Sequence, residues 1–143
     1  MNRDLPPDRC DRRTALRYGG AALLALPTAG CVTEGSSTPT VEMAEGFAFV
    51  PETVTVTSGA TVRWENESEV SHTVTAYGER IPDDAEYFAS GGFDSERAAR
   101  NHVTGGLVGP GGSYEHTFMQ SGTYEYFCTP HEGSGMVGSV RVK

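Results

Sequence analysis

Residues 128–136 read Cys-Thr-Pro-His-Glu-Gly-Ser-Gly-Met and contain three side chains that can bind a transition metal. Cys128, His131 and Met136 offer a thiolate, an imidazole and a thioether at Cys-x2-His-x4-Met spacing. These soft and borderline ligands suit copper, and two His with one Cys and a weak, long axial Met form the blue-copper arrangement. The segment supplies one His, and His72, beside an upstream strand, is the best candidate for the second. We therefore expect a copper site made of these four residues.

Each of these side chains also has an ordinary structural interpretation when it is taken alone. Cys128 ends a predicted strand, where a lone Cys is usually a small buried hydrophobic residue. A disulfide is a further alternative, although Cys31 is the only other Cys after residue 30. His131 alone is compatible with a surface position and Met136 alone with the core. Their combination in one short loop with two glycines favours the metal.

A metal ion held by His72 and residues 128–136 would cross-link parts of the chain that lie 56 residues apart, so its binding should stabilise the fold. Hydrogen bonding around the Cys sulfur tunes the redox potential of such a site. Pro130 has no N–H and cannot donate a hydrogen bond to this sulfur. We expect the backbone N–H of Thr73, next to the upstream ligand, to take this role.

Short segments of alternating apolar and polar residues must position the metal loop. A period of two indicates half-buried antiparallel strands. Val41 with Met43, and Phe47 with Phe49, follow the same alternation, and Pro51 indicates a sheet edge or a bend. About seven short strands separated by turns predict an all-β fold, a two-sheet sandwich. The later alternating segments are residues 53–57, 61–66, 113–118, 123–128 and 138–143.

Residues 77–112 are the least strand-like part, and we interpret them as an excursion between strands. Segments 82–89 and 94–101 are candidates for one or two short helices, the second with Asp94 as its cap. His102 is expected to be exposed in this Gly-rich region. His116 lies on a predicted strand, where a hydrogen-bonded structural role is expected. Neither His is assigned to copper.

The first 40 residues are predicted to be a targeting segment and a linker. In residues 1–31, an Arg12-Arg13 pair precedes an apolar stretch that is too short to span a bilayer but suits a signal peptide of the twin-arginine type. Cys31 follows small residues, as in a lipoprotein box that would make it a lipidated N-terminus. Simple secretion after a small-residue cleavage site is the alternative. Residues 32–40 are a Gly/Ser/Thr/Pro tether, and the folded domain covers 41–143.

The charge distribution argues against nucleic acid as a partner. The chain has a formal net charge of −8, and Lys143 is its only Lys. Nucleic-acid binding needs a basic face, which this composition does not supply. Such an acidic, Lys-poor chain resembles proteins of salt-loving archaea, and ordinary acidic solubility is the alternative. An acidic cluster in the excursion is either a docking patch or a solvated face; its members are Asp83, Asp84 and Glu86.

The domain at 41–143 resembles cupredoxins of the plastocyanin, amicyanin and pseudoazurin branch. The resemblance rests on residues 128–136 and on the Thr-x-Arg-Trp-x-Asn pattern of residues 61–66. With its acidic composition, lipobox and Arg pair, the chain is most similar to halocyanins. Plastocyanins place a Tyr before the ligand Cys, and Phe127 stands there in this chain.

This resemblance implies a Greek-key β-sandwich with one type 1 copper that cycles between Cu(I) and Cu(II). It implies the same four ligands, His72, Cys128, His131 and Met136. It also implies that the ring edge of His131 lies near the surface, where the electron leaves.

The expected function is a one-electron carrier at the outer face of the cell membrane, and not an enzyme. Four protein ligands leave no open position, which a catalytic metal keeps. An oxidase or reductase would need further His clusters, a binuclear centre a second Cys in the loop, and a copper-delivery module paired Cys or Met-rich tracts. The sequence has none of these. The expected partners are membrane-bound or soluble redox proteins of an electron-transport chain, and the carrier is expected to be a monomer.

Overall fold

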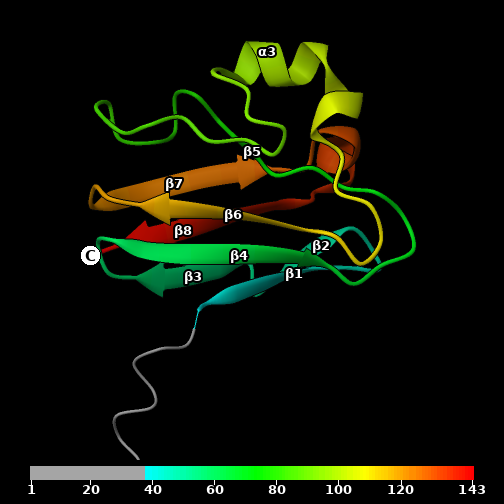
Figure 1. Cartoon of the computed structure of the whole chain (residues 1–143), viewed down its shortest axis with the longest axis horizontal. Coiled ribbons are helices and arrows are strands. Elements are labelled where there is room, and N and C mark those ends of the chain that lie inside the picture. The colour runs from blue at the N-terminus through cyan, green and yellow to red at the C-terminus, as the bar shows by residue number, and fades with distance from the viewer. Residues whose placement is uncertain (1–37) are drawn as a thin grey trace, which may run out of the picture. The chain divides into compact units, whose positions relative to one another are not determined.

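Two four-stranded sheets pack face to face in the computed structural model, which describes residues 38–143 (Figure 1). One sheet has the order β2-β1-β4-β6 and the other β3-β8-β7-β5. The elements are β1 Thr40–Ala44, β2 Ala48–Val50, β3 Thr53–Val56, β4 Ala60–Asn66, β5 Thr75–Ala76, α3 Glu96–Asn101, η2 Val103–Gly106, β6 Ser113–Phe118, β7 Gly122–Phe127, η3 Thr129–Ser134 and β8 Val137–Val142. The all-β prediction is confirmed. The predictions for 1–31 and for 32–37 lie outside the described residues.

The sheets are mixed, which differs from the antiparallel pairing that the alternation predicts. β1 pairs with β4 in parallel, and β3 pairs with β8 in parallel, whereas the other pairs are antiparallel. The chain leaves the first sheet at its edge strand β2 and enters the second at its edge strand β3. Pro51 lies between these two strands, so the predicted edge or bend at this residue is confirmed.

The core between the sheets is built around Trp64, which is fully buried. Its ring packs edge-on to Tyr126 at 5.4 Å and lies 5.6 Å from Tyr114. The alternating residues of β1, β4, β7 and β8 face this core, as their period of two requires. Such aromatic packing fixes the spacing of the sheets that carry the two halves of the metal site.

The excursion between β5 and β6 contains one α-helix, α3, and the predicted helix at 82–89 is wrong. A single turn closes where Ala85 donates to the Pro82 carbonyl at 3.0 Å. The chain then runs extended beside β5, where the N–H of Ala76 donates to the carbonyl of Phe88. Phe88 is buried in the core, so its backbone is committed to this pairing and not to a helix.

The predicted helix at 94–101 is present as α3, but its cap is Ser95 and not Asp94. The Ser95 hydroxyl accepts a hydrogen bond from the N–H of Ala98 at 3.1 Å. Figure 1 places α3 and the excursion on the β5–β7 side of the sandwich. Among residues 38–143, no helix is long and apolar enough to cross a membrane.

Phe47 does not belong to a strand, although its alternation with Phe49 predicts one. It lies in the turn between β1 and β2 with a positive φ of 58°. Phe49 points into the core, whereas Phe47 is 38% exposed. The turn therefore directs the Phe47 side chain toward the end of the sandwich that carries the metal site.

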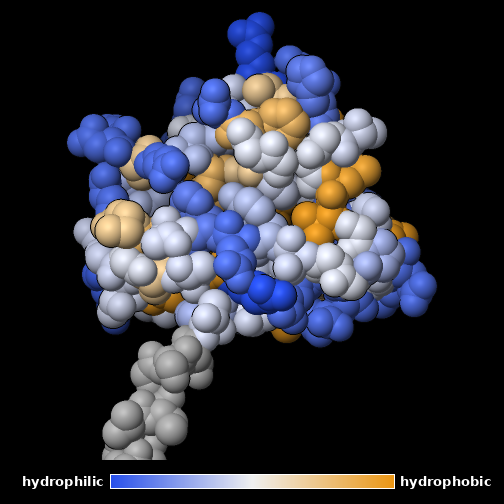
Figure 2. Space-filling view, viewed as in Figure 1, coloured by the Kyte–Doolittle hydropathy of each residue, from blue (hydrophilic) through white to orange (hydrophobic). Residues whose placement is uncertain are grey.

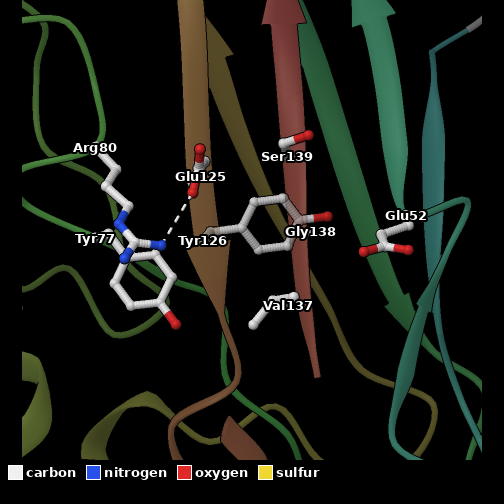
Figure 3. A pocket seen from close by; sticks show the side chains of 8 residues that line it. All are labelled: Glu52, Tyr77, Arg80, Glu125, Tyr126, Val137, Gly138 and Ser139. Carbon is white, nitrogen blue, oxygen red and sulfur yellow. Dashed lines mark hydrogen bonds and ion pairs between the residues drawn. The ribbon is translucent and has the colours of Figure 1, made fainter. Parts of the chain in front are cut away.

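Gly138 provides a test of the core beside the small pocket drawn in Figure 3. The figure shows the Tyr126 ring directed from β7 toward Gly138 on β8. A Cβ at position 138 would lie 2.5 Å from the Tyr126 hydroxyl oxygen. Gly138→Ala should therefore lower the free energy of unfolding by about 1–3 kcal/mol. Urea unfolding of the copper-free protein measures this change.

Gly133→Ala is the control, because a Cβ there has no neighbour within 4 Å. Its effect should stay within about 0.5 kcal/mol. Equal effects of the two substitutions would contradict the packing interpretation.

Candidate metal centre

Three of the predicted ligands converge at one end of the sandwich. His72 lies in the loop between β4 and β5, where its backbone forms a bridge with Val108. Cys128 directly follows β7, and His131 lies in η3. His72 and Cys128 are fully buried, and His131 is half-buried.

The three side chains form a triangle of donor atoms. The Nδ1 atoms of His72 and His131 are 3.2 Å apart, and the Cys128 Sγ lies 3.7 Å from the first and 3.3 Å from the second. A transition metal with bonds of about 2.0–2.3 Å to nitrogen and sulfur requires donor separations of about 3.5 Å in a trigonal plane. The observed triangle fits such an ion. Among the described residues, these three are the His, Cys and carboxylate side chains whose ligand atoms lie close enough together to hold a metal ion.

Met136 completes the loop on the buried side. Its carbonyl accepts a hydrogen bond from the N–H of Cys128 at 3.0 Å, and its own N–H donates to the carbonyl of His131 at 3.3 Å. Its side chain is fully buried in the same cluster as Cys128. The thioether thus belongs to the cluster that contains the thiol. The role of these four residues as copper ligands stays a prediction.

Hydrogen bonds join the two segments that carry the ligands. The N–H of Thr73 donates to the Cys128 Sγ at 3.3 Å, which confirms the predicted donor. The N–H of Thr129 donates to the Thr73 hydroxyl at 2.7 Å, and the hydroxyls of Thr75 and Thr129 are 3.1 Å apart. These contacts hold the Cys128 sulfur next to the His72 loop.

The ring orientation of His72 is set by Ser68 and Asn66. The Ser68 hydroxyl lies 2.8 Å from the His72 Nε2, and it donates to the Asn66 Oδ1 at 2.8 Å. Because this hydroxyl already donates its proton, it accepts from a protonated Nε2. The Nδ1 of His72 then keeps its lone pair and faces the triangle, as a metal ligand requires.

Asn66 holds the loop that positions this serine. Its Nδ2 donates to the carbonyls of Val70 and Val108 at 2.8 and 2.9 Å, and its Oδ1 also accepts from the N–H of Ser68. The buried amide is therefore fully hydrogen-bonded.

Burial favours the neutral forms of all three donor groups. It lowers the pKa of His72, with a further decrease from the neighbouring His131 and an increase from Glu45. It also lowers the pKa of His131. Burial raises the pKa of the Cys128 thiol, and the hydrogen bond from Thr73 opposes this change. Neutral imidazoles are ready to bind a metal, whereas the thiol must release a proton when the metal binds.

Phe47 is a site residue that the alternation does not reveal. Its ring stacks on the ring of His131, with centroids 4.2 Å apart and planes 18° from parallel. It also meets the ring of His72 edge-on at 6.4 Å. The only signal in the sequence is the preceding Gly46, which indicates a turn and not its direction.

The other two His residues lie away from the centre. His102 is exposed at the end of α3, as predicted. His116 packs against the rings of Phe88 and Phe118, both at 4.8 Å. Within residues 38–143, no hydrogen bond joins the His116 ring to another protein group, so its hydrogen-bonded role stays a prediction. Its packing against the two aromatic rings agrees with a structural role.

Comparison with known proteins identifies the family. The profile described as "Copper binding proteins, plastocyanin/azurin family" matches residues 37–143. The chain belongs to this family. It is 35% identical over 97 residues to plastocyanin from Scenedesmus fuscus, which covers 68% of this chain and 88% of that protein. It is 34% identical over 97 residues to plastocyanin B'/B'' from Nicotiana tabacum, which covers 68% and 89%.

A solved structure supports the same fold. Amicyanin from Paracoccus versutus matches with a TM-score of 0.52 and 26% identity over 76% of this chain and 83% of that one. The cupredoxin prediction and the Greek-key sandwich are confirmed, and so is copper as the cofactor of this family member. Similarity to halocyanins stays a prediction.

Ser68→Ala tests the orientation of His72. The substitution removes the acceptor of the His72 Nε2–H, so the ring is free to turn and copper affinity should fall about 10- to 100-fold. Competition with a copper chelator measures the affinity. The control is Ser139→Ala on β8, whose hydroxyl contacts the exposed Thr53. Equal affinity of the Ser68→Ala variant and the unaltered protein would contradict this role.

Proposed function

We propose that this cupredoxin is a one-electron carrier in which His72, Cys128, His131 and Met136 bind copper. The observation that supports it most is the buried triangle of two Nδ1 atoms and one Sγ. Copper, when bound, supplies the Cu(I)/Cu(II) couple. The chain supplies a site whose donors come from packed segments and are already close together.

The protein's contribution to electron transfer is to keep its donor groups in place. The hydrogen bonds of Thr73 and Thr129 fix the Cys128 segment, and Ser68 fixes the ring of His72. When little has to move between two oxidation states, the barrier to electron transfer is low. A closed donor set of four side chains also leaves no open position for a substrate, which supports a carrier and not an enzyme.

The ring of His131 is the proposed exit for the electron. It is half-buried, and the exposed Phe47 covers one of its faces. Val70 and Leu107, in the loops before β5 and β6, are also exposed apolar residues. Figure 2 shows apolar side chains (orange) toward the end of the molecule that carries these loops in Figure 1. Such a surface suits brief contact with redox proteins of an electron-transport chain.

We further propose that the carrier is a monomer anchored by a lipid on Cys31 at the outer face of the cell membrane. The support comes from the Arg12-Arg13 pair, the apolar stretch after it and the small residues before Cys31. Residues 32–40 would be a tether that lets the domain reach partners above the membrane.

Redox cycling tests the carrier function. The copper-loaded protein should be reduced and reoxidised repeatedly by a small redox couple with its copper retained in both states. Cyclic voltammetry combined with copper analysis after gel filtration measures this behaviour. Loss of copper on reduction would contradict a carrier and favour copper delivery.

Mass spectrometry of the membrane fraction tests the anchor. The mature protein should begin at Cys31 and carry a lipid adduct, and Cys31→Ala should release the protein from membranes. An N-terminus beyond Cys31 without an adduct would contradict the anchor and favour simple secretion.

A further inference from the structure

The metal loop, residues 128–136, is held at three places, and at one of them the partner side chains come from the excursion. At its start, Thr129 is hydrogen-bonded to the His72 segment. At its end, Met136 returns to Cys128 through the backbone. In its middle, Glu132 directly follows His131, and its carboxylate is bound by side chains from the excursion. The three residues after it, 133–135, are exposed.

Arg100 of α3 binds Glu132 with both arms of its guanidinium. The Nη1 donates to Oε1 at 2.8 Å and the Nη2 to Oε2 at 3.2 Å. The hydroxyl of Tyr77 donates to the same Oε2 at 2.7 Å. A two-pronged arginine contact fixes both the distance and the angle of a carboxylate, which a single contact does not.

The same guanidinium covers the residue that precedes the ligand Cys. It lies 4.2 Å above the ring of Phe127, and the ring of Tyr77 lies 4.4 Å from that of Phe127. Neighbouring residues of a strand point to opposite faces, so Phe127 points away from the core that Tyr126 faces. Phe127 is nevertheless fully buried. The side chains of Arg100 and Tyr77 therefore cover the outer face of β7 next to Cys128.

α3 is itself tied to the body of the sandwich. The Nε of Arg100 donates to the Glu96 Oε2 at 2.7 Å, and the Glu96 Oε1 accepts from the N–H of Gly78 at 2.9 Å. Gly78 follows β5 closely, so the network connects the segment after β5, α3 and η3. In Figure 1 the coil of η3 lies close to the excursion helices, in agreement with these contacts.

This arrangement differs from an ordinary surface ion pair, such as the one between Arg80 and Glu125 of β7. Arg80 and Glu125 (Figure 3) meet through one contact of 3.2 Å, and their side chains are 60% and 44% exposed. Isolated exposed pairs contribute little, whereas two-pronged geometry within a network is the recognised exception. Arg100 has that geometry, which Arg80 lacks. Both guanidinium groups also lie over an aromatic ring, that of Arg80 4.7 Å from the Tyr77 ring and that of Arg100 4.2 Å from the Phe127 ring.

We propose that Arg100 is a positioning residue for the metal loop: it clamps Glu132 and so fixes the adjacent His131. The excursion then has a function, because α3 carries the clamp. The benefit of this positioning for electron transfer rests on the proposed function. The clamp itself is a property of the copper-free chain as well.

The test compares Arg100→Gln with Arg97→Gln in the full chain. Arg97 lies on the same helix, is exposed, and has no ion pair within the described part of the chain, so both variants lose the same charge from α3. In the copper-free protein, Arg100→Gln should increase amide hydrogen exchange about tenfold at residues 131–135, while the amides of β7 keep their protection. Arg97→Gln should leave both regions unchanged.

A copper-loaded measurement separates positioning from general stability. Arg100→Gln should speed copper transfer to a chelator about tenfold. It should also broaden the copper lines in the electron paramagnetic resonance spectrum, because His131 then occupies a range of positions. Arg100→Lys keeps the positive charge but cannot make the two-pronged contact with Glu132. Its loop exchange and copper transfer should therefore lie between those of Arg100→Gln and the unaltered protein.

Two results would overturn the clamp. One is equal loop exchange in the Arg100→Gln and Arg97→Gln variants. The other is additive effects of Arg100→Gln and Glu132→Gln on loop exchange in the double variant, since partners in one interaction must be non-additive. Because hydrogen exchange needs no metal, the clamp can fail while the copper function holds, and the reverse is equally visible.

Discussion

The metal centre depends on the hydrogen bonds between residues 73–75 and residues 128–129. His72 comes from the loop between the two sheets, and Cys128 from the end of β7, 56 residues later in the chain. The Thr73 N–H to the Cys128 Sγ, and the N–H of Thr129 to the Thr73 hydroxyl, bring the two backbones together. β5, the strand that follows His72, has only two residues and pairs with β7 over a short length. The hydrogen bonds to Cys128 and Thr129 are therefore needed to keep His72 close to Cys128.

Local patterns in the sequence predict the sandwich and the centre, but not the side chains that support them. Alternation identifies the strand faces, and Cys-x2-His-x4-Met identifies the metal loop. Phe47 escapes this approach, because a left-handed turn changes the direction of its side chain. The helix expected at 82–89 fails because Phe88 is drawn into the core. These outcomes are set by tertiary packing, which no local window contains.

The supporting residues act on different parts of the centre. Ser68 and Asn66 determine which nitrogen of His72 faces the metal, and they belong to the loop after β4. Arg100 acts on the segment that carries His131, through Glu132, and it comes from α3, which is not part of either sheet. A buried ligand is thus oriented by an internal hydrogen bond, and a half-buried one by an ion pair at the surface.

The most direct test of the central claim is the visible and electron paramagnetic resonance spectrum of the protein with one equivalent of Cu(II). A thiolate ligand in a trigonal site with a weak axial ligand predicts an intense blue charge-transfer band and narrow copper hyperfine splitting. Both should disappear in Cys128→Ser. A pale, ordinary Cu(II) spectrum that is unaffected by Cys128→Ser would contradict the type 1 copper site.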